Sequence, residues 1–335
     1  MRVFVTGGTG LVGHHTIRQL VARGDAVTAL ARSAAAADEL RALGATPLGG
    51  DVTDPATLAR GVEAADAVVH GAAILLEQKN WETFRVFNVA PTETIAKLAA
   101  RAGVRLVHLS SVAAYGRRTV YDGGPGSVTE DFGLDRPIFP GDHYARSKRE
   151  AELAVWRIAE ETGLRAVVLR PCVIYGEGDR NFSPRVARAL RAGIAPMIGD
   201  GTNVLSVVYA GNVAAAVLAA LDRPTVTGAF NVTNDGHLTQ RQFVEAFARG
   251  LGRRVRLLPV PKGLAWSAAR VLEGARRAVW PGGNTTTLMG AVHFLGGTNP
   301  FVSARAAAVL GWRPVTDAAE AAERTGRWFR EHAVA

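Results

Sequence analysis

The chain has 335 residues, of which 48% are hydrophobic and 21% charged, and it contains one cysteine, Cys172. This composition excludes an intrinsically disordered chain, an internal disulfide and a metal site built from several thiolates, and we expect a cytoplasmic protein. The 39 lysines and arginines exceed the 30 aspartates and glutamates, giving a net charge of +9, but they are scattered and form no basic tail. We therefore expect no nucleic-acid partner.

Two further classes of site or segment are not predicted. His14 and His15 have no additional ligands at a useful spacing, so we expect no metal site. The most apolar region, 263–295, is interrupted by charged residues, so we expect no membrane span. The charged residues that interrupt it are Arg270, Glu273, Arg276 and Arg277.

From residue 1 to about residue 175, short β-branched runs alternate with segments of helical period. The expected strands lie near 2–6, 26–31, 46–48, 67–70, 104–110 and 166–170. The expected helices lie near 11–23, 34–43, 55–62, 88–102 and 143–162. This alternation predicts an α/β protein with a doubly wound (Rossmann) parallel sheet.

After residue 175 the pattern loosens, and loops that contain glycine and proline separate the helices. The expected helices in this part lie near 184–192, 211–222, 239–250 and 263–278. We predict a dinucleotide-binding domain over 1–175. Residues 176–335 are expected to form mainly a smaller C-terminal substrate lobe, with some segments returning to the Rossmann core.

A glycine-rich turn follows the first expected strand and opens a helix. Its glycines are Gly7, Gly10 and Gly13, with Leu11 and Val12 before the last of them. Glycine lets the backbone turn sharply and approach a pyrophosphate, and the N-terminus of a helix favours an anion. The turn therefore predicts dinucleotide binding.

Arg32 ends the second expected strand, where an NAD-selective site would hold a carboxylate against the ribose 2′-hydroxyl. A guanidinium suits a 2′-phosphate, so Arg32 favours NADP, although NAD remains possible. The alternative is a solvated arginine that flanks the adenine.

Tyr144 and Lys148 lie four residues apart at the start of a helical segment and therefore share one face. An ammonium group beside a phenol stabilises the phenolate, which allows tyrosine to exchange a proton with an alcohol or carbonyl. Upstream, Ser110 and Ser111 end an expected strand at the edge of the sheet where ligands bind. One of these serines is predicted to hydrogen-bond the substrate oxygen.

Taken together, these residues resemble those of an extended short-chain dehydrogenase/reductase, the family that includes nucleotide-sugar epimerases and 3β-hydroxysteroid dehydrogenases. The resemblance covers nearly the whole chain. Besides the glycine turn and the Tyr144/Lys148 pair, it is carried by Asp51-Val52, His70-Gly71-Ala72-Ala73, Asn88-Val89, Ser110-Ser111, Arg170-Pro171 and Tyr175-Gly176.

The resemblance implies a catalytic role for four residues. It favours Ser111 over Ser110 as the catalytic serine, because Ser111 lies four residues before Tyr115-Gly116. Tyr144 would be the acid/base, and Lys148 would bind the nicotinamide ribose and lower the pKa of Tyr144. Asn88 is either part of a proton relay or a helix cap. Ala90-Pro91 follows Asn88-Val89 where relatives often have glycine, so the helix geometry there is open.

The resemblance also places residues around the cofactor. Asp51 and Val52 would border the adenine. Ala72 and Ala73 would let the chain pass close to the cofactor. Pro171 and Val173 would lie beside the nicotinamide.

The substrate is expected to be a lipophilic secondary alcohol or ketone. Many nucleotide-sugar enzymes of the family carry asparagine two residues before the Tyr-Gly pair, whereas this chain has Val173. The stretches 203–214 and 310–314 resemble those of 3β-hydroxysteroid dehydrogenase-like members. Nucleotide-sugar epimerisation or dehydration is the alternative, and a non-catalytic NAD(P)-binding regulator is the second alternative. The family also implies a homodimer formed through the helices near 88–102 and 143–162.

Overall fold

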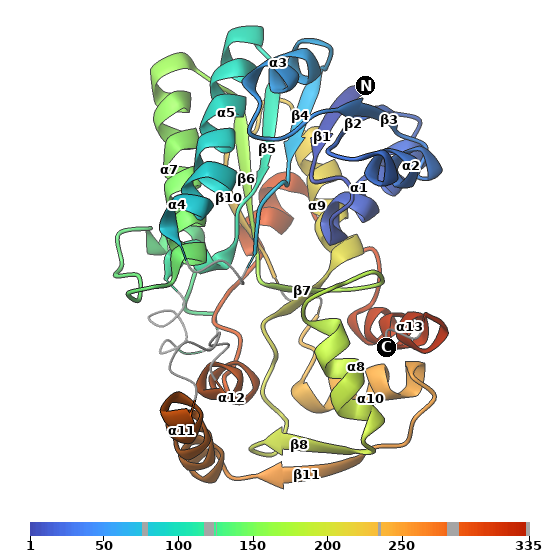
Figure 1. Ribbon diagram of the computed structural model, residues 1–335, viewed down its shortest axis with the longest axis vertical. Coiled ribbons are helices and arrows are strands. Elements are labelled where there is room, and N and C mark those ends of the chain that lie inside the picture. Colours follow the sequence, from blue (N-terminus) through green and yellow to red (C-terminus); the bar gives the residue numbers. More distant parts are fainter. Residues whose placement is uncertain (76–79, 117–123, 125, 234–235, 280–287, 333–335) are drawn as a thin grey trace.

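The computed structural model describes residues 1–75, 80–116, 124, 126–233, 236–279 and 288–332 (Figure 1). Its centre is a sheet of seven parallel strands in the order β10-β6-β5-β4-β1-β2-β3. The strands are β1 Arg2–Thr6, β2 Ala26–Ala31, β3 Thr46–Gly49, β4 Ala67–His70, β5 Arg105–Leu109, β6 Ala166–Pro171 and β10 Gly228–Val232. The predicted doubly wound α/β fold is confirmed.

Helices cover both faces of the sheet. On one face lie α1 Leu11–Ala22, α2 Ala34–Ala42 and α9 Ala210–Leu221, and on the other lie α3 Pro55–Glu63, α5 Ala90–Ala102 and α7 His143–Thr162. Side chains alternate along a strand, so Val3 and Val5 of β1 join the core with α1, whereas Phe4 joins the core with α3 and α5. Both faces are therefore buried, as a parallel sheet requires.

Two segments from beyond residue 175 return to this sheet. Helix α9 packs beside α1, where Gln19 Nε2 donates a hydrogen bond to the Gly211 carbonyl oxygen at 2.8 Å. Strand β10 pairs with β6 as the outermost strand, with Phe230 opposite Leu169. The sequence did not predict β10, because Gly228 and Asn231 interrupt its apolar pattern. The division of the chain at residue 175 stays a prediction.

The remaining segments form the lobe at the lower end of Figure 1. Its helices are α8 Ser183–Arg191, α10 Gln240–Gly250, α11 Lys262–Val279, α12 Leu288–Gly296 and α13 Ala318–Glu331. Its strands are β7 Val173–Tyr175, β8 Ile194–Ile198, β9 Val207–Tyr209 and β11 Arg256–Val260, which pair as β7 with β9 and β8 with β11. Tyr175, Phe243 and Phe247 are buried in its core. The four short strands, α12 and α13 were not predicted.

The helix expected over 88–102 begins earlier and changes pitch. It runs as α4 Trp81–Phe84, a π-helical turn Arg85–Val89 and then α5. Pro91 has no N–H group to donate to the carbonyl of Phe87, so the regular hydrogen bond is missing where the wide turn occurs. Asn88 lies buried in this turn. Other short helices are Val112–Tyr115, Glu130–Phe132 and Ala306–Leu310.

Candidate active site

The segments that carry the predicted site begin at one edge of the central sheet. Thr6, His70 and His108 lie side by side in register at the carboxyl ends of β1, β4 and β5. The chain then continues into the glycine turn, into Gly71 and into Ser110. In open parallel sheets this is the edge at which ligands bind.

The glycine turn has a geometry that side chains would obstruct. Gly7 has a φ of 75°, and a Cβ atom there would lie 2.7 Å from the Ala72 backbone nitrogen. A Cβ atom on Gly13 would overlap the Gly7 carbonyl oxygen, while the Gly10 N–H donates to that oxygen at 3.0 Å. Leu11 and Val12 form the partly buried first turn of α1. The turn thus brings backbone N–H groups to a helix N-terminus, which fits a pyrophosphate.

The residues predicted around the adenine lie at the ends of β2 and β3. Arg32 is exposed and directly precedes Ser33, whose side chain caps α2 by accepting from the Ala36 N–H. Asp51 accepts hydrogen bonds from the backbone N–H and hydroxyl of Thr53 at 2.9 and 2.7 Å. These bonds, with a smaller contribution from the Arg32 charge, lower the pKa of Asp51. The structure therefore brings Arg32 and Asp51 into one electrostatic environment.

Tyr144 and Lys148 occupy the first two turns of α7, which Asp142 caps by accepting from the Ala145 N–H at 3.1 Å. Tyr144 is half-buried and Lys148 is buried. Lys148 Nζ donates to the Leu109 carbonyl oxygen at 2.8 Å. Burial lowers the pKa of Lys148 to about 8, against the attraction of Glu152. This bond fixes the helix to the end of β5, immediately before the two serines.

The two serines have different surroundings. Ser110 is buried, and its hydroxyl donates to Glu152 Oε2 at 2.7 Å. Ser111 is partly exposed, and its Oγ accepts from the Ala113 N–H at 3.1 Å at the start of a short 3₁₀ helix. Ser110 is thus engaged in the interior, whereas Ser111 retains a hydroxyl proton that it can donate.

Asn88 connects three segments of the site. Its Oδ1 accepts from the Ile74 N–H at 2.8 Å, and its Nδ2 donates to the Ile74 carbonyl oxygen at 3.2 Å. Nδ2 also donates to Ser147 Oγ at 2.9 Å, and the Ser147 hydroxyl donates to the Tyr144 carbonyl oxygen at 2.8 Å. Asn88 therefore holds the chain after β4 against the helix that bears Tyr144. Its side chain caps no helix here.

A buried hydrogen-bond chain continues from Asn88 to the glycine turn. The Thr92 hydroxyl donates to the Asn88 carbonyl oxygen at 2.7 Å and contacts His70 Nε2 at 2.8 Å, while His70 Nδ1 contacts Thr6 Oγ1 at 2.7 Å. Thr6 Oγ1 also accepts from the Ala72 N–H at 3.3 Å. Burial, followed by the charge of Lys148, lowers the pKa of His70 to about 3, so this ring is neutral.

The donor and acceptor of each hydrogen bond in this series follow from the groups that begin and end the series. The Thr92 hydroxyl proton is used by a carbonyl, which can only accept, so His70 Nε2 carries the ring proton and donates to Thr92. Nδ1 then accepts from the Thr6 hydroxyl. The sequence motif contained His70 but predicted no role for it, and it did not indicate Thr92. The spacing of Asn88 and Thr92, one helical turn apart, was the available signal.

A buried ion pair supports the same helix from its other side. Arg170 of β6 donates from Nε to Glu152 Oε1 at 3.0 Å, and its Nη1 donates to the Tyr115 hydroxyl at 2.6 Å. The Tyr115 hydroxyl donates in turn to Asn231 Oδ1 at 2.9 Å. Glu152 and Asn231 were not predicted, because the partner of each, Arg170 and Tyr115 respectively, is distant in sequence.

The other predicted cofactor residues lie beside this group. Ala72 and Ala73 follow β4 and are partly exposed, next to the Ile74 contact of Asn88. Pro171 is the last residue of β6 and is buried. Val173 lies in β7, where its N–H donates to the Ser206 carbonyl oxygen at 3.1 Å and its half-buried side chain packs against the core of the lobe.

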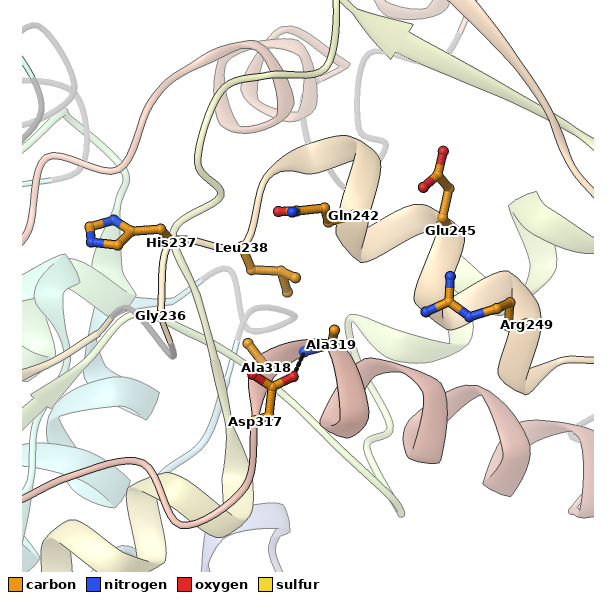
Figure 2. A pocket seen from close by; sticks show the side chains of 9 residues that line it. All are labelled: Gly236, His237, Leu238, Gln242, Glu245, Arg249, Asp317, Ala318 and Ala319. Carbon is orange, nitrogen blue, oxygen red and sulfur yellow. Dashed lines mark hydrogen bonds between the residues drawn. The ribbon is translucent and has the colours of Figure 1, made fainter.

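A pocket of about 340 Å³ lies elsewhere, between α10 and the start of α13 (Figure 2). Gln242 belongs to the capping box of α10, Asp317 caps α13, and Arg249 pairs with Glu323. Because these polar side chains already have structural partners and no predicted catalytic residue lines the pocket, it is not the candidate active site.

Two classes of site or segment are absent from the part of the chain that the structure describes. No three His, Cys, Asp or Glu side chains lie together in a way that could bind a metal ion. None of the helices there is both long and apolar enough to span a bilayer.

Comparisons with known proteins show the family of the chain. A family model described as the NAD dependent epimerase/dehydratase family matches residues 3–234. The 4-hydroxy-2-methyl-3-oxo-4-farnesyl-3,4-dihydroquinoline-1-oxide ketoreductase of Stigmatella aurantiaca is 33% identical over 298 residues, covering 88% of this chain and 87% of that protein. The 2-alkyl-3-oxoalkanoate reductase of Stenotrophomonas maltophilia is 30% identical over 287 residues, covering 84% of each.

Two further proteins are similar over most of the chain. The 3beta-hydroxysteroid-dehydrogenase/decarboxylase isoform 1 of Arabidopsis thaliana is 27% identical over 96% of this chain and 78% of that protein. Among solved structures, the dTDP-glucose 4,6-dehydratase of Streptomyces venezuelae, with NAD bound, has a TM-score of 0.69 and 27% identity. That match covers 99% of this chain and 97% of the other.

Proposed function

The chain belongs to the NAD dependent epimerase/dehydratase family. We propose that it transfers hydride between NADP and a lipophilic secondary alcohol or ketone. The family and the predicted class of enzyme are confirmed: with reductases and dehydrogenases among its relatives, the chain is an NAD(P)-dependent oxidoreductase. The specific substrate and the preference for NADP are proposals. The observation that carries the proposed chemistry is the buried Lys148, held at the end of β5 one turn from Tyr144.

Tyr144, Lys148 and Ser111 have separate roles in the proposed reaction. A bound nicotinamide supplies or accepts the hydride at the carbinol carbon. In ketone reduction the Tyr144 hydroxyl gives its proton to the substrate oxygen, and the Lys148 ammonium stabilises the phenolate that remains. Ser111 donates a hydrogen bond to the same oxygen and so fixes its position. The proton from Tyr144 and the hydride that a bound reduced nicotinamide would supply together convert the ketone to the alcohol.

Asn88 has a positioning role in this proposal. Its side chain is fully engaged with Ile74 and Ser147, so it sets the distance between the chain after β4 and the helix of Tyr144. Both segments border the expected nicotinamide site. Asn88 is therefore proposed to hold Tyr144 in place.

The proposed substrate class rests on Val173 and on two relatives. Two relatives, at 33% and 30% identity, are named for a farnesyl-bearing quinoline ketone and for 2-alkyl-3-oxoalkanoates, both of which carry hydrocarbon chains. Val173 provides an apolar, half-buried surface where a polar anchor for a sugar nucleotide would be expected. Both observations favour a ketone or alcohol with a large apolar part.

Conversion of nucleotide sugars is the second candidate. It is favoured by the similarity of the whole chain to a dTDP-glucose 4,6-dehydratase. A cofactor-absorbance screen over lipophilic ketones and alcohols and over UDP- and dTDP-sugars separates the two. We expect turnover only with the lipophilic panel. Conversion of sugars without net change in the cofactor would establish the alternative.

Tyr144→Phe tests the chemistry itself. The ring is kept and only the hydroxyl is lost, so kcat should fall at least about a hundredfold while cofactor affinity stays within about twofold. Tyr175→Phe is the matched control, because the Tyr175 hydroxyl bonds the Ala318 carbonyl oxygen inside the lobe. Wild-type turnover by Tyr144→Phe would contradict the assignment of Tyr144 as the acid/base.

The proposed preference for NADP rests on Arg32 at the N-terminus of α2. A 2′-phosphate there would meet both a guanidinium and the positive end of a helix. Such a charged hydrogen bond contributes roughly 1.5 to 3 kcal/mol, or about ten- to a hundredfold in affinity. Arg32→Asp should lose NADPH binding and keep NADH binding in a fluorescence titration. Equal wild-type affinities would show that Arg32 does not select the cofactor.

A further inference from the structure

Helix α11 exposes three of its aliphatic side chains, whereas its one tryptophan, Trp266, is half-buried against His293 of α12. Leu264, Val271 and Leu272 are 62%, 71% and 58% exposed. The side that faces the lobe carries Ala265, Ala269 and the carboxylate residue Glu273, all buried. A helix of a water-soluble lobe normally shows the opposite distribution.

The exposed apolar residues follow one stripe along the helix. Leu264, Ala268, Val271, Leu272 and Ala275 are spaced by three or four residues or lie next to each other, and all are exposed. Single exposed apolar residues need no explanation, but a continuous stripe marks a surface that binds something.

The charges on the same helix are almost all positive. Lys262 and Arg270 are exposed. Arg276 and Arg277 follow near the C-terminal end of the α11 sequence. Glu273 is the only acidic residue of this helix and lies on its buried side. Asp200, which lies near Lys262, is the acidic neighbour from another segment. The exposed surface of α11 therefore carries an apolar stripe, with Arg270 at its margin and Lys262 at the N-terminal end of the helix.

The position of α11 leaves this face accessible to a large partner. Figure 1 shows α11 with β8 and β11 at the end of the lobe opposite the central sheet. The adjoining strands add Ile194 and Leu258, which are also exposed at this end of the molecule. The apolar residues thus belong to one end of the protein.

We propose that α11 binds the surface of an anionic lipid membrane. Leu264, Val271 and Leu272 enter the boundary between headgroups and acyl chains, and Lys262 and Arg270 contact lipid phosphates. A second copy of the chain fits less well, because pairing two such faces brings cations against cations. The binding is peripheral and does not depend on the proposed reaction, so it is tested without turnover.

The test is co-sedimentation of the full chain with vesicles. Vesicles of equal phosphatidylglycerol and phosphatidylcholine should retain the protein, vesicles of phosphatidylcholine alone should retain much less, and added salt should release it. The triple variant L264S/V271S/L272S and the double variant K262E/R270E should each bind at least about tenfold more weakly. Val315→Ser is the control, since Val315 is 66% exposed but lies outside α11.

Folding of each variant is checked by its melting temperature and by cofactor binding. The proposal is overturned if the wild type does not bind anionic vesicles, or if the α11 variants bind as well as Val315→Ser does. A wild-type dimer that the triple variant converts to a monomer, without vesicle binding, would assign this face to a second copy. If only the triple variant lost vesicle binding, and lipid charge had no effect on the binding of the wild type, the proposed preference for anionic membranes would likewise be contradicted.

Discussion

At the scale of single residues, Ser110 and Ser111 show how neighbours in sequence acquire different roles. Ser110→Ala removes a buried hydrogen bond to Glu152, so we expect a loss of roughly 1 to 3 kcal/mol in the free energy of unfolding with little change in kcat. Ser111→Ala should leave stability nearly unchanged and lower kcat at least about tenfold. Denaturant unfolding and steady-state kinetics on both variants measure this. A larger loss of kcat in Ser110→Ala would mean that the wrong serine is assigned.

Lys148 predicts the pH dependence of ketone reduction. Its pKa lies near 8 because the side chain is buried, so the ammonium is present below that pH and is lost above it. The neutral amine cannot stabilise the Tyr144 phenolate, and kcat/KM for reduction should therefore fall as the pH rises through about 8. A profile from about pH 6 to about pH 10 measures the fall. A rate that stays level to the alkaline end would contradict the role of Lys148.

At the scale of elements, the hydrogen-bond chain from Thr6 to Ser147 links the glycine turn to α7 through β4 and α5. Each donor and acceptor along it is matched, so one missing hydroxyl leaves two buried groups without partners. Thr92 is the point at which the chain passes from the strand to the helix, and it is the most informative position for a substitution.

Thr92→Val keeps the shape of the side chain but removes its hydroxyl, and Thr92→Ser keeps the hydroxyl. We expect Thr92→Val to lose roughly 1 to 3 kcal/mol in the free energy of unfolding and to lower kcat more than it raises KM, because Asn88 and the helix of Tyr144 shift. Thr92→Ser should restore most of kcat. If both variants lose kcat equally, the methyl group and not the hydroxyl is what matters.

The elements of the first half could be predicted from sequence, and those of the second half only in part. The strands at 2–6, 26–31 and 67–70 and the helix at 143–162 match the structure because apolar period and caps agree there. Strand β10 was missed because its place depends on pairing with β6, not on its own pattern. The π-helical turn before Pro91 is a departure from regular geometry that periodicity does not specify.

The candidate site shows the same limit. Tyr144, Lys148 and the glycines could be found from spacing, because local geometry places them. His15 is buried near Glu177, which follows β7, and Tyr209, the last residue of β9, both from the middle of the chain. Its burial depends on how the lobe closes on α1, and so could not be predicted from α1 alone.

At the scale of the whole molecule, the family resemblance predicts a homodimer that forms through the outer face of α5 and α7. The two helices lie side by side on one face of the sheet (Figure 1), and the Arg157–Glu93 ion pair joins them at 3.0 Å. Leu153 is 48% exposed in the middle of α7, although its helix is otherwise well packed. A two-fold axis there would bury Leu153 and form a four-helix interface.

Leu153→Glu tests this arrangement, because it would place a carboxylate from each copy in an apolar contact near the axis. We expect light scattering to show a dimer for the wild type at micromolar concentration and a monomer for the variant, with the dimer dissociation constant raised about a hundredfold or more. Val309→Glu, at a position 43% exposed and outside α5 and α7, should remain dimeric. Since the helix of Tyr144 borders the expected interface, the monomeric variant should also have a lower kcat than the dimeric wild type. A monomeric wild type would contradict the dimer, and a dimeric Leu153→Glu would place its interface elsewhere.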